Sequence, residues 1–259
     1  MALGVERRGS VAIVTLSAEA ARNAFNNDSM QVISDTLNEL MDDVDVKSIV
    51  ITGTGKFFCA GADIEEFQLC IDEGRIGPLV DDLTSILHPL QVRMRSDSTI
   101  LIAAMNGAAA GGGLGLALAC DARIASPEAK LAAAFFKLGL SPDGGTTWLL
   151  PRLVGNQVTR RFFFNDEIWS GEKAHDLGAV DALVSNDDLI DTAVEWAIDW
   201  GKWSPMSRSG TKQLLDASTS TFFQTQLELE QALIIAASQT KQFEEGVAAF
   251  LEKRDPDFS

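Results

Sequence analysis

The chain has 259 residues, of which 46% are apolar and 22% charged, a composition typical of a globular protein with a buried core. Its 37 acidic residues outnumber its 21 basic residues, so the formal net charge is -16. This excess of negative charge argues against nucleic acid as a partner, because phosphate binding requires clustered Lys and Arg.

The first half of the chain alternates between two kinds of apolar pattern. The run VAIVTL at 11–16 predicts a strand, and the apolar spacing after Asp28 predicts a helix over 29–44 with Asp28 as its N-cap. SIVIT at 48–52 predicts a second strand, closed by glycines. A helix is expected over 79–95, and Pro89 should bend or divide it.

The middle of the chain continues the alternation. TILIAAM at 99–105 predicts a buried strand, and a glycine turn then leads into a helix over 114–120. Shorter strands are expected at 121–125 and 180–184. Strands that alternate with helices indicate an α/β fold.

After about Asp187 the pattern predicts helices only, at 187–203, 208–218, 222–239 and 244–254. We therefore predict two parts, a core with the active site at 1–190 and a helical region at 191–259. The helical region carries more apolar surface than one short helix needs, at Phe222, Phe223, Leu227 and Leu229. Such surface is typical of oligomerisation.

Cysteine usage and the N-terminus indicate where the protein resides. Cys59, Cys70 and Cys120 are an odd number without metal-ligand spacing, so we expect free thiols and no metal site. The segment MALGVERRGS lacks the apolar run of a signal peptide. No apolar stretch reaches the roughly 18 residues of a membrane span. We predict a cytoplasmic protein that does not bind membranes.

Two small-residue turns could supply backbone donors to one ligand atom. Gly111–Gly113 precede a helix, where the free N–H groups and the helix dipole favour an anion. The stretch KFFCAGADIEEF at 56–67 follows a predicted strand and has the same character. The two turns can form an oxyanion hole made of backbone. Close helix packing without any ligand is the alternative for the glycines.

Three motifs together resemble the enoyl-CoA hydratase/isomerase (crotonase) superfamily: FCAGADI at 58–64, NGAAAGGGLGLALACD at 106–121 and GLSPDGGTTWLLPRLVG at 139–155. The resemblance extends from ARNAFN at 21–26 to FLEKRDPDF at 250–258. It implies an α/β, crotonase-like spiral of ββα repeats, followed by a C-terminal helical trimerisation region. It also implies a homotrimer or a dimer of trimers, in which the Ala62 and Gly112 amides hold a thioester oxygen.

Members of this superfamily catalyse different reactions, depending on which acidic residues line the pocket. Its hydratases use two glutamates, and the matching positions here hold Gly115 and Phe135, so water addition by the usual pair is not expected. Asp143, in SPDGG, resembles the catalytic acid/base of enoyl-CoA isomerases of the phenylacetate-degradation type. An apolar pocket near Phe135 and Phe136 would make it a stronger base. From the local sequence alone, Asp143 is also a residue type that favours a tight turn or a helix N-cap.

We therefore predict an acyl-CoA isomerase in which Asp143 shifts the double bond of a 3-enoyl-CoA to C2. His88, in ILHPL, leaves an alternative open. One interpretation is a histidine packed in the core. The other is that His88 resembles the catalytic histidine of the 4-chlorobenzoyl-CoA dehalogenases of this superfamily. In those enzymes an aspartate attacks the aromatic ring and the histidine activates water. Other thioester hydrolases or hydratases, and a catalytically silent crotonase-fold scaffold, are further alternatives.

The resemblance implies that coenzyme A enters as the substrate thioester and that no other cofactor is needed. The residues expected to hold it are Arg22, Ala24, Ala60, Asp63, Ile64, Phe250 and Lys253. Phe250 and Lys253 resemble tail residues that reach the coenzyme A of a neighbouring subunit. A basic residue at a helix end is also favoured by the helix dipole alone.

Overall fold

Two sheets form the centre of the computed structural model, which describes residues 2–17 and 22–258. Within these ranges, the larger sheet has the order β1 (Ala2–Arg8), β2 (Val11–Ser17), β3 (Ser48–Gly53), β5 (Ile100–Met105), β7 (Ala122–Ala125) and β10 (Ala182–Leu183). The smaller sheet has the order β4 (Phe57–Cys59), β6 (Ala108–Ala110), β8 (Lys130–Ala132) and β9 (Ile168–Ser170). In the larger sheet only the β1–β2 pair is antiparallel among the described strands.

The three long predicted strands are confirmed as β2, β3 and β5, which are hydrogen-bonded neighbours. They are mostly apolar because both of their faces are largely buried. Val14 and Ile51 point into a larger core, which α1 (Asn27–Asp42), α3 (Ile76–Ser96) and α4 (Gly112–Ala119) cover. Ile13 and Val50 point into a smaller core on the opposite face, under α8 (Leu189–Gly201).

Helix α1 begins at a different residue from the one predicted. Its N-cap is Asn26, whose side chain accepts a 2.8 Å hydrogen bond from the Ser29 amide. The Ser29 hydroxyl accepts one in return from the Asn26 amide, also at 2.8 Å. This reciprocal capping box stabilises the earlier start. The prediction of Asp28 as the N-cap is therefore wrong, and Asp28 lies in the first helical turn.

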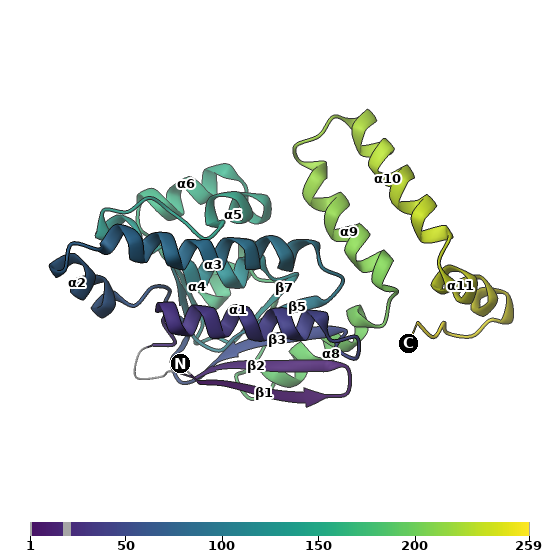
Figure 1. The fold of residues 1–259 in the computed structure, drawn as a ribbon, viewed down its shortest axis with the longest axis horizontal. Coiled ribbons are helices and arrows are strands. Elements are labelled where there is room, and N and C mark those ends of the chain that lie inside the picture. The colour runs from purple at the N-terminus through teal and green to yellow at the C-terminus, as the bar shows by residue number, and fades with distance from the viewer. Residues whose placement is uncertain (1, 18–21, 259) are drawn as a thin grey trace.

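Pro89 does not divide α3, which runs unbroken from Ile76 to Ser96 (Figure 1). A proline inside a helix removes one backbone hydrogen bond and costs about 3 kcal/mol. Leu87, Leu90 and Met94, on both sides of the proline, are buried in the larger core. Their burial offsets the lost hydrogen bond, so the helix is not divided, and a bend at Pro89 stays a prediction.

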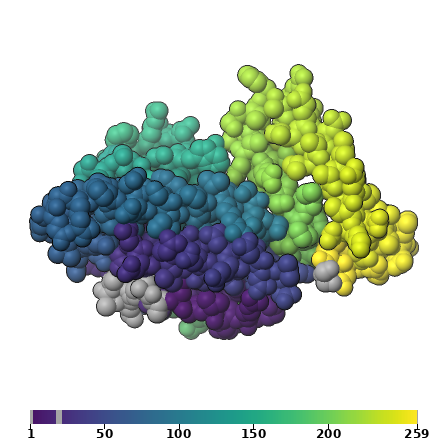
Figure 2. Space-filling model, viewed as in Figure 1, coloured from purple at the N-terminus to yellow at the C-terminus, as the bar shows by residue number. Residues whose placement is uncertain are grey.

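Shorter helices complete the core, and three longer ones extend from it. The shorter ones are α2 (Ile64–Asp72), α5 (Thr146–Val154), α6 (Asn156–Phe164) and α7 (Gly171–Asp176). Helices α9 (Pro205–Ser218), α10 (Phe223–Ser238) and α11 (Lys241–Glu252) stand beside the core, in green to yellow (Figures 1 and 2). None of the helices within the described ranges has the length and hydropathy needed to cross a membrane.

The predicted boundary at residue 190 falls inside α8, which contacts β3 and β5 of the sheet. The two-part division stays a prediction, and helices α9 to α11 are the ones that leave the core. The apolar side chains proposed for oligomerisation are exposed in the single chain: Phe222, Phe223, Leu227 and Leu229. Whether they bury against a second copy stays a prediction.

A buried ion pair ties α9 to the core. Lys212 and Asp121 approach to 2.6 Å, and their side chains are only 6% and 10% exposed. Lys212 also donates to the Met94 and Thr99 carbonyls. Removing the ammonium would leave a buried carboxylate unpaired, so we expect Lys212→Met to lower the free energy of unfolding by about 3–5 kcal/mol. Urea denaturation measures the change.

The matched control is Lys202→Met, because Lys202 pairs with Asp199 at 3.2 Å on an exposed part of α8 and its C-cap. An exposed pair contributes at most about 1 kcal/mol. Equal losses in the two variants would contradict the assignment of Lys212 as an anchor.

Candidate active site

The loop that carries Ala62 is paired with the segment before α1. Phe25 donates its amide to the Gly61 carbonyl at 2.6 Å, and Asp63 donates to the Phe25 carbonyl at 2.8 Å. Ala60 donates to the Arg22 carbonyl at 3.1 Å. These three bonds fix the backbone on both sides of Ala62.

Asn23 anchors the segment that leads into the same loop. Its fully buried side chain donates to the Thr54 carbonyl at 3.1 Å and to the Phe57 carbonyl at 2.8 Å. The buried Cys59 thiol donates to the Asn23 carbonyl at 3.0 Å. Burial raises the pKa of Cys59 to about 12, so it stays a neutral thiol and adds no negative charge beside the loop.

The glycines of the second turn allow two backbones to touch. A Cβ at Gly113 would lie 2.3 Å from the Cys59 carbonyl oxygen, so α4 could not approach β4 with any other residue there. A Cβ at Gly61 would lie 3.1 Å from the Gly112 nitrogen. The loop before Ala62 and the first amide of α4 are therefore neighbours.

Within the described ranges, neither the Ala62 nor the Gly112 amide donates a hydrogen bond to a protein acceptor. Gly112 is the first residue of α4, where amides lack a partner inside the helix and the dipole is positive. Two neighbouring donors of this kind are suited to one anionic oxygen. The packing interpretation of the glycines and the oxyanion interpretation are thus compatible.

Asp143 lies at the start of a tight turn. Its carbonyl accepts from the Thr146 amide at 3.3 Å and from the Thr146 hydroxyl at 2.8 Å. Gly144 and Gly145 have φ values of +62° and +71°, which the type I′ turn requires and glycine permits. A Cβ at Gly144 would lie 3.4 Å from the Gly112 Cα. The turn that carries Asp143 therefore packs against Gly112 at the start of α4.

Asp143 is not a helix N-cap, because α5 begins after Gly145. Its side chain pairs with His88 on α3, where His88 Nε2 and Asp143 Oδ1 are 2.9 Å apart. The two side chains are 50% and 41% exposed, so the interpretation of His88 as a packed core residue is wrong. An ionised carboxylate can only accept, so in that state the shared proton lies on His88 Nε2.

The two phenylalanines expected around Asp143 have different surroundings. Phe135 is buried, and its ring reaches 3.9 Å from the Cβ position of Gly111, beside the oxyanion turn. Phe136 packs edge-on against Phe164 of α6, with ring centroids 5.5 Å apart. The carboxylate of Asp143 is half-exposed in the single chain and is not enclosed by these rings.

The position that would carry a hydratase glutamate has no room for a side chain. A Cβ at Gly115 would lie 2.2 Å from the Gly144 carbonyl oxygen. Real Cβ atoms do not approach so closely, so α4 and the Asp143 turn can meet only with glycine at this position.

Five of the residues predicted to hold coenzyme A are brought together by the loop pairing: Arg22, Ala24, Ala60, Asp63 and Ile64. Ala24 is buried, whereas Arg22 and Ile64 are exposed. Asp63 also has a structural task, because it caps α2 by accepting from the Glu65 amide at 2.9 Å.

Phe250 and Lys253 are not part of this group. They lie at the end of α11, at the opposite side of the molecule from α2, and Phe250 is 84% exposed (Figure 1). Within one chain the structure does not bring them to the site, and their role in a neighbouring subunit stays a prediction.

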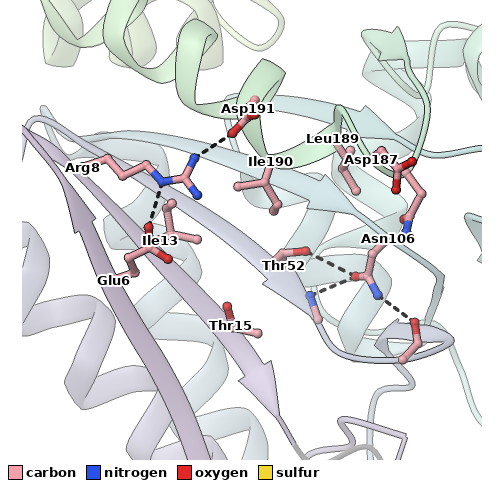
Figure 3. A pocket seen from close by; sticks show the side chains of 13 residues that line it. Glu6, Arg8, Ile13, Thr15, Thr52, Asn106, Asp187, Leu189, Ile190 and Asp191 are labelled. Carbon is pink, nitrogen blue, oxygen red and sulfur yellow. Dashed lines mark hydrogen bonds and ion pairs between the residues drawn. The ribbon is translucent and has the colours of Figure 1, made fainter.

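The cavity in Figure 3 has a volume of about 510 Å³ and is separate from the oxyanion turns. Ile13 and Leu189 line it, and both belong to the smaller core under α8. Arg8 bridges Glu6 and Asp191 at its rim. Ala62 packs on the larger core, so this cavity is on the other face of the sheet from the oxyanion turns.

Known proteins resemble the chain over nearly its whole length. The family pattern described as enoyl-CoA hydratase/isomerase matches residues 6–259. The chain is 33% identical to a 1,2-epoxyphenylacetyl-CoA isomerase of Escherichia coli K12, over 96% of the chain and 95% of that protein. It is 32% identical to a 2,3-dehydroadipyl-CoA hydratase of the same strain, over 98% and 97%.

A solved structure agrees with these sequence similarities. The crystal structure of an enoyl-CoA hydratase from Polaromonas sp. JS666 has a TM-score of 0.90 and 31% identity, and the match covers 98% of both chains. The predicted fold class, an α/β spiral with C-terminal helices, is therefore confirmed.

Proposed function

Since the chain belongs to the enoyl-CoA hydratase/isomerase family, we propose that it is an acyl-CoA isomerase, which converts a 3-enoyl-CoA to the 2-enoyl-CoA. Relatives carry both hydratase and isomerase names, so the choice of reaction depends on the site itself. The observation that carries the proposal is the contact between Gly115 and Gly144, which excludes a glutamate at position 115 and packs the turn that carries Asp143 against α4.

The reaction needs one base and one anion site. The Asp143 carboxylate removes a proton from C2, and the negative charge moves onto the thioester oxygen. The Ala62 and Gly112 amides hold that oxygen, and preorganised donors of this kind are worth about 3–4 kcal/mol each. Asp143 then returns the proton at C4. No water is added, so no second carboxylate is required.

His88 has a supporting role in this scheme. Its 2.9 Å hydrogen bond to Asp143 orients the carboxylate that acts as the base. We assign Arg22, Ala60 and Ile64 to the binding of coenzyme A, with Phe250 and Lys253 completing the site from a neighbouring subunit of a homotrimer.

The His88–Asp143 pair also favours a second candidate, hydrolytic chemistry on a CoA thioester. In a dehalogenase-like reaction, Asp143 would displace chloride from an aromatic ring and form an aryl ester. His88 would then take a proton from the water that cleaves this ester. Water can reach the pair in the single chain, because both side chains are half-exposed.

One assay separates the candidates. The purified protein is given 3-hexenoyl-CoA, and the absorbance of the conjugated product is followed; the proposal predicts turnover. Chloride release from 4-chlorobenzoyl-CoA, or free coenzyme A from either substrate, with no conjugation would instead support the hydrolytic candidate. Tight binding of both thioesters with no turnover would support a silent scaffold.

A further inference from the structure

A glutamine in the core contacts the turn that carries Asp143. Gln91 lies on α3 and is only 8% exposed, between the buried residues Leu90 and Met94. Burying an amide among apolar side chains is unfavourable unless it is hydrogen-bonded. Its Nε2 donates to the Gly144 carbonyl at 2.9 Å, which is one residue beyond Asp143.

The same carbonyl is confined on its other side by α4. The Gly144 oxygen occupies the space that a Cβ of Gly115 would fill. The peptide after Asp143 therefore lies between α3 and α4, with a hydrogen bond from one helix and a close contact from the other.

His88 and Gln91 are three residues apart, so they share one face of α3. His88 bonds the Asp143 carboxylate, and Gln91 bonds the backbone that follows it. Two attachments from one rigid helix restrict both the position of the turn and the direction of the side chain.

We propose that Gln91 is a positioning residue that holds the Asp143–Thr146 turn against the first turn of α4 and so sets the distance between the base and the oxyanion donors. This inference rests on the proposed isomerase function for its kinetic consequences, whereas its structural consequences are independent of the reaction. Gln91 acts through the Gly144 peptide and not on the reacting atoms themselves.

The test compares Gln91→Met with Leu90→Met. Methionine nearly matches glutamine in shape but lacks the donor, and Leu90 is the adjacent buried residue of α3. Because small displacements of a catalytic group are costly, we expect Gln91→Met to lower kcat about 10- to 100-fold with little change in KM. Leu90→Met should retain kcat within about twofold.

Amide hydrogen exchange of the 141–150 segment provides a readout that does not need turnover. In Gln91→Met this segment should exchange several-fold faster than in the wild type and in Leu90→Met, while exchange in β3 and β5 stays the same. Unchanged exchange at 141–150 would overturn the proposal, and so would a kcat equal to that of the wild type. If the wild type itself isomerises no 3-enoyl-CoA, the proposed function fails, and hydrogen exchange still decides the role of Gln91.

Discussion

Asp143→Asn is expected to reduce the isomerisation rate by about 10³-fold while binding of acyl-CoA persists. The asparagine amide keeps the shape of the side chain and can still bond His88, so the turn and the His88 contact remain. What is lost is the basic oxygen that removes the C2 proton. The kcat for 3-hexenoyl-CoA and the dissociation constant of a saturated acyl-CoA, from calorimetry, measure the two effects separately.

The matched control is Asp176→Asn, on the exposed side of α7. It should leave both kcat and binding unchanged within about twofold, as surface substitutions usually do. An Asp143→Asn variant that isomerises at more than a tenth of the wild-type rate would contradict the role of Asp143 as the base.

Gly115→Glu is expected to destabilise the protein and not to create a hydratase. The residue type matches the hydratase pattern, but a Cβ here would lie 2.2 Å from the Gly144 oxygen, and that oxygen belongs to a backbone held by Gln91. Separating α4 from the turn should cost about 3 kcal/mol or more, even for Gly115→Ala. It would also move Asp143 away from Gly112, so we expect isomerisation to fall with stability.

Thermal denaturation and the two activities test this prediction. The control is Gly77→Ala on α3, where no atom outside the neighbouring backbone of the helix lies within 4 Å of the Cβ position. Alanine in an exposed helix favours folding by about 0.5–1 kcal/mol, so this variant should be at least as stable as the wild type. A stable Gly115→Glu protein that hydrates 2-enoyl-CoA would contradict the conclusion that position 115 has no room for a glutamate.

The sequence predicts the central elements well because local pattern and burial agree there. VAIVTL and SIVIT are mostly apolar, and the structure buries both of their faces, one under α8 and one under α1 and α3. The resemblance in three motifs likewise predicts the fold, which depends on small residues at fixed spacing. By contrast, β4, β6, β8 and β9 have three residues each, too few for a period to be recognised.

The missed features of the site are contacts between residues far apart in the chain. His88 and Asp143 are 55 residues apart, and although the resemblance offers His88 as a catalytic histidine, ILHPL alone does not decide between that role and a place in the core. Gln91 carries no motif, and its function appears only once Gly144 is located. A buried polar residue within an apolar helical face, here Gln91 beside Leu90, is the one signal that could have identified it.

The choice of N-cap shows the same limit at short range. Asp28 and Asn26 are both good capping residues, and the helical spacing of the apolar residues does not distinguish them. Ser29 decides between them, because only Asn26 is three residues before it and can form the reciprocal pair.

A crystal structure of Asp143→Asn with bound 3-hexenoyl-CoA tests the central claim most directly. The account predicts that the thioester oxygen lies about 2.7–3.1 Å from both the Ala62 and the Gly112 nitrogens. It also predicts that the substituted side chain at position 143 lies about 3–3.5 Å from C2. A thioester oxygen bound away from these two amides, or a side chain at position 143 directed into solvent, would contradict it.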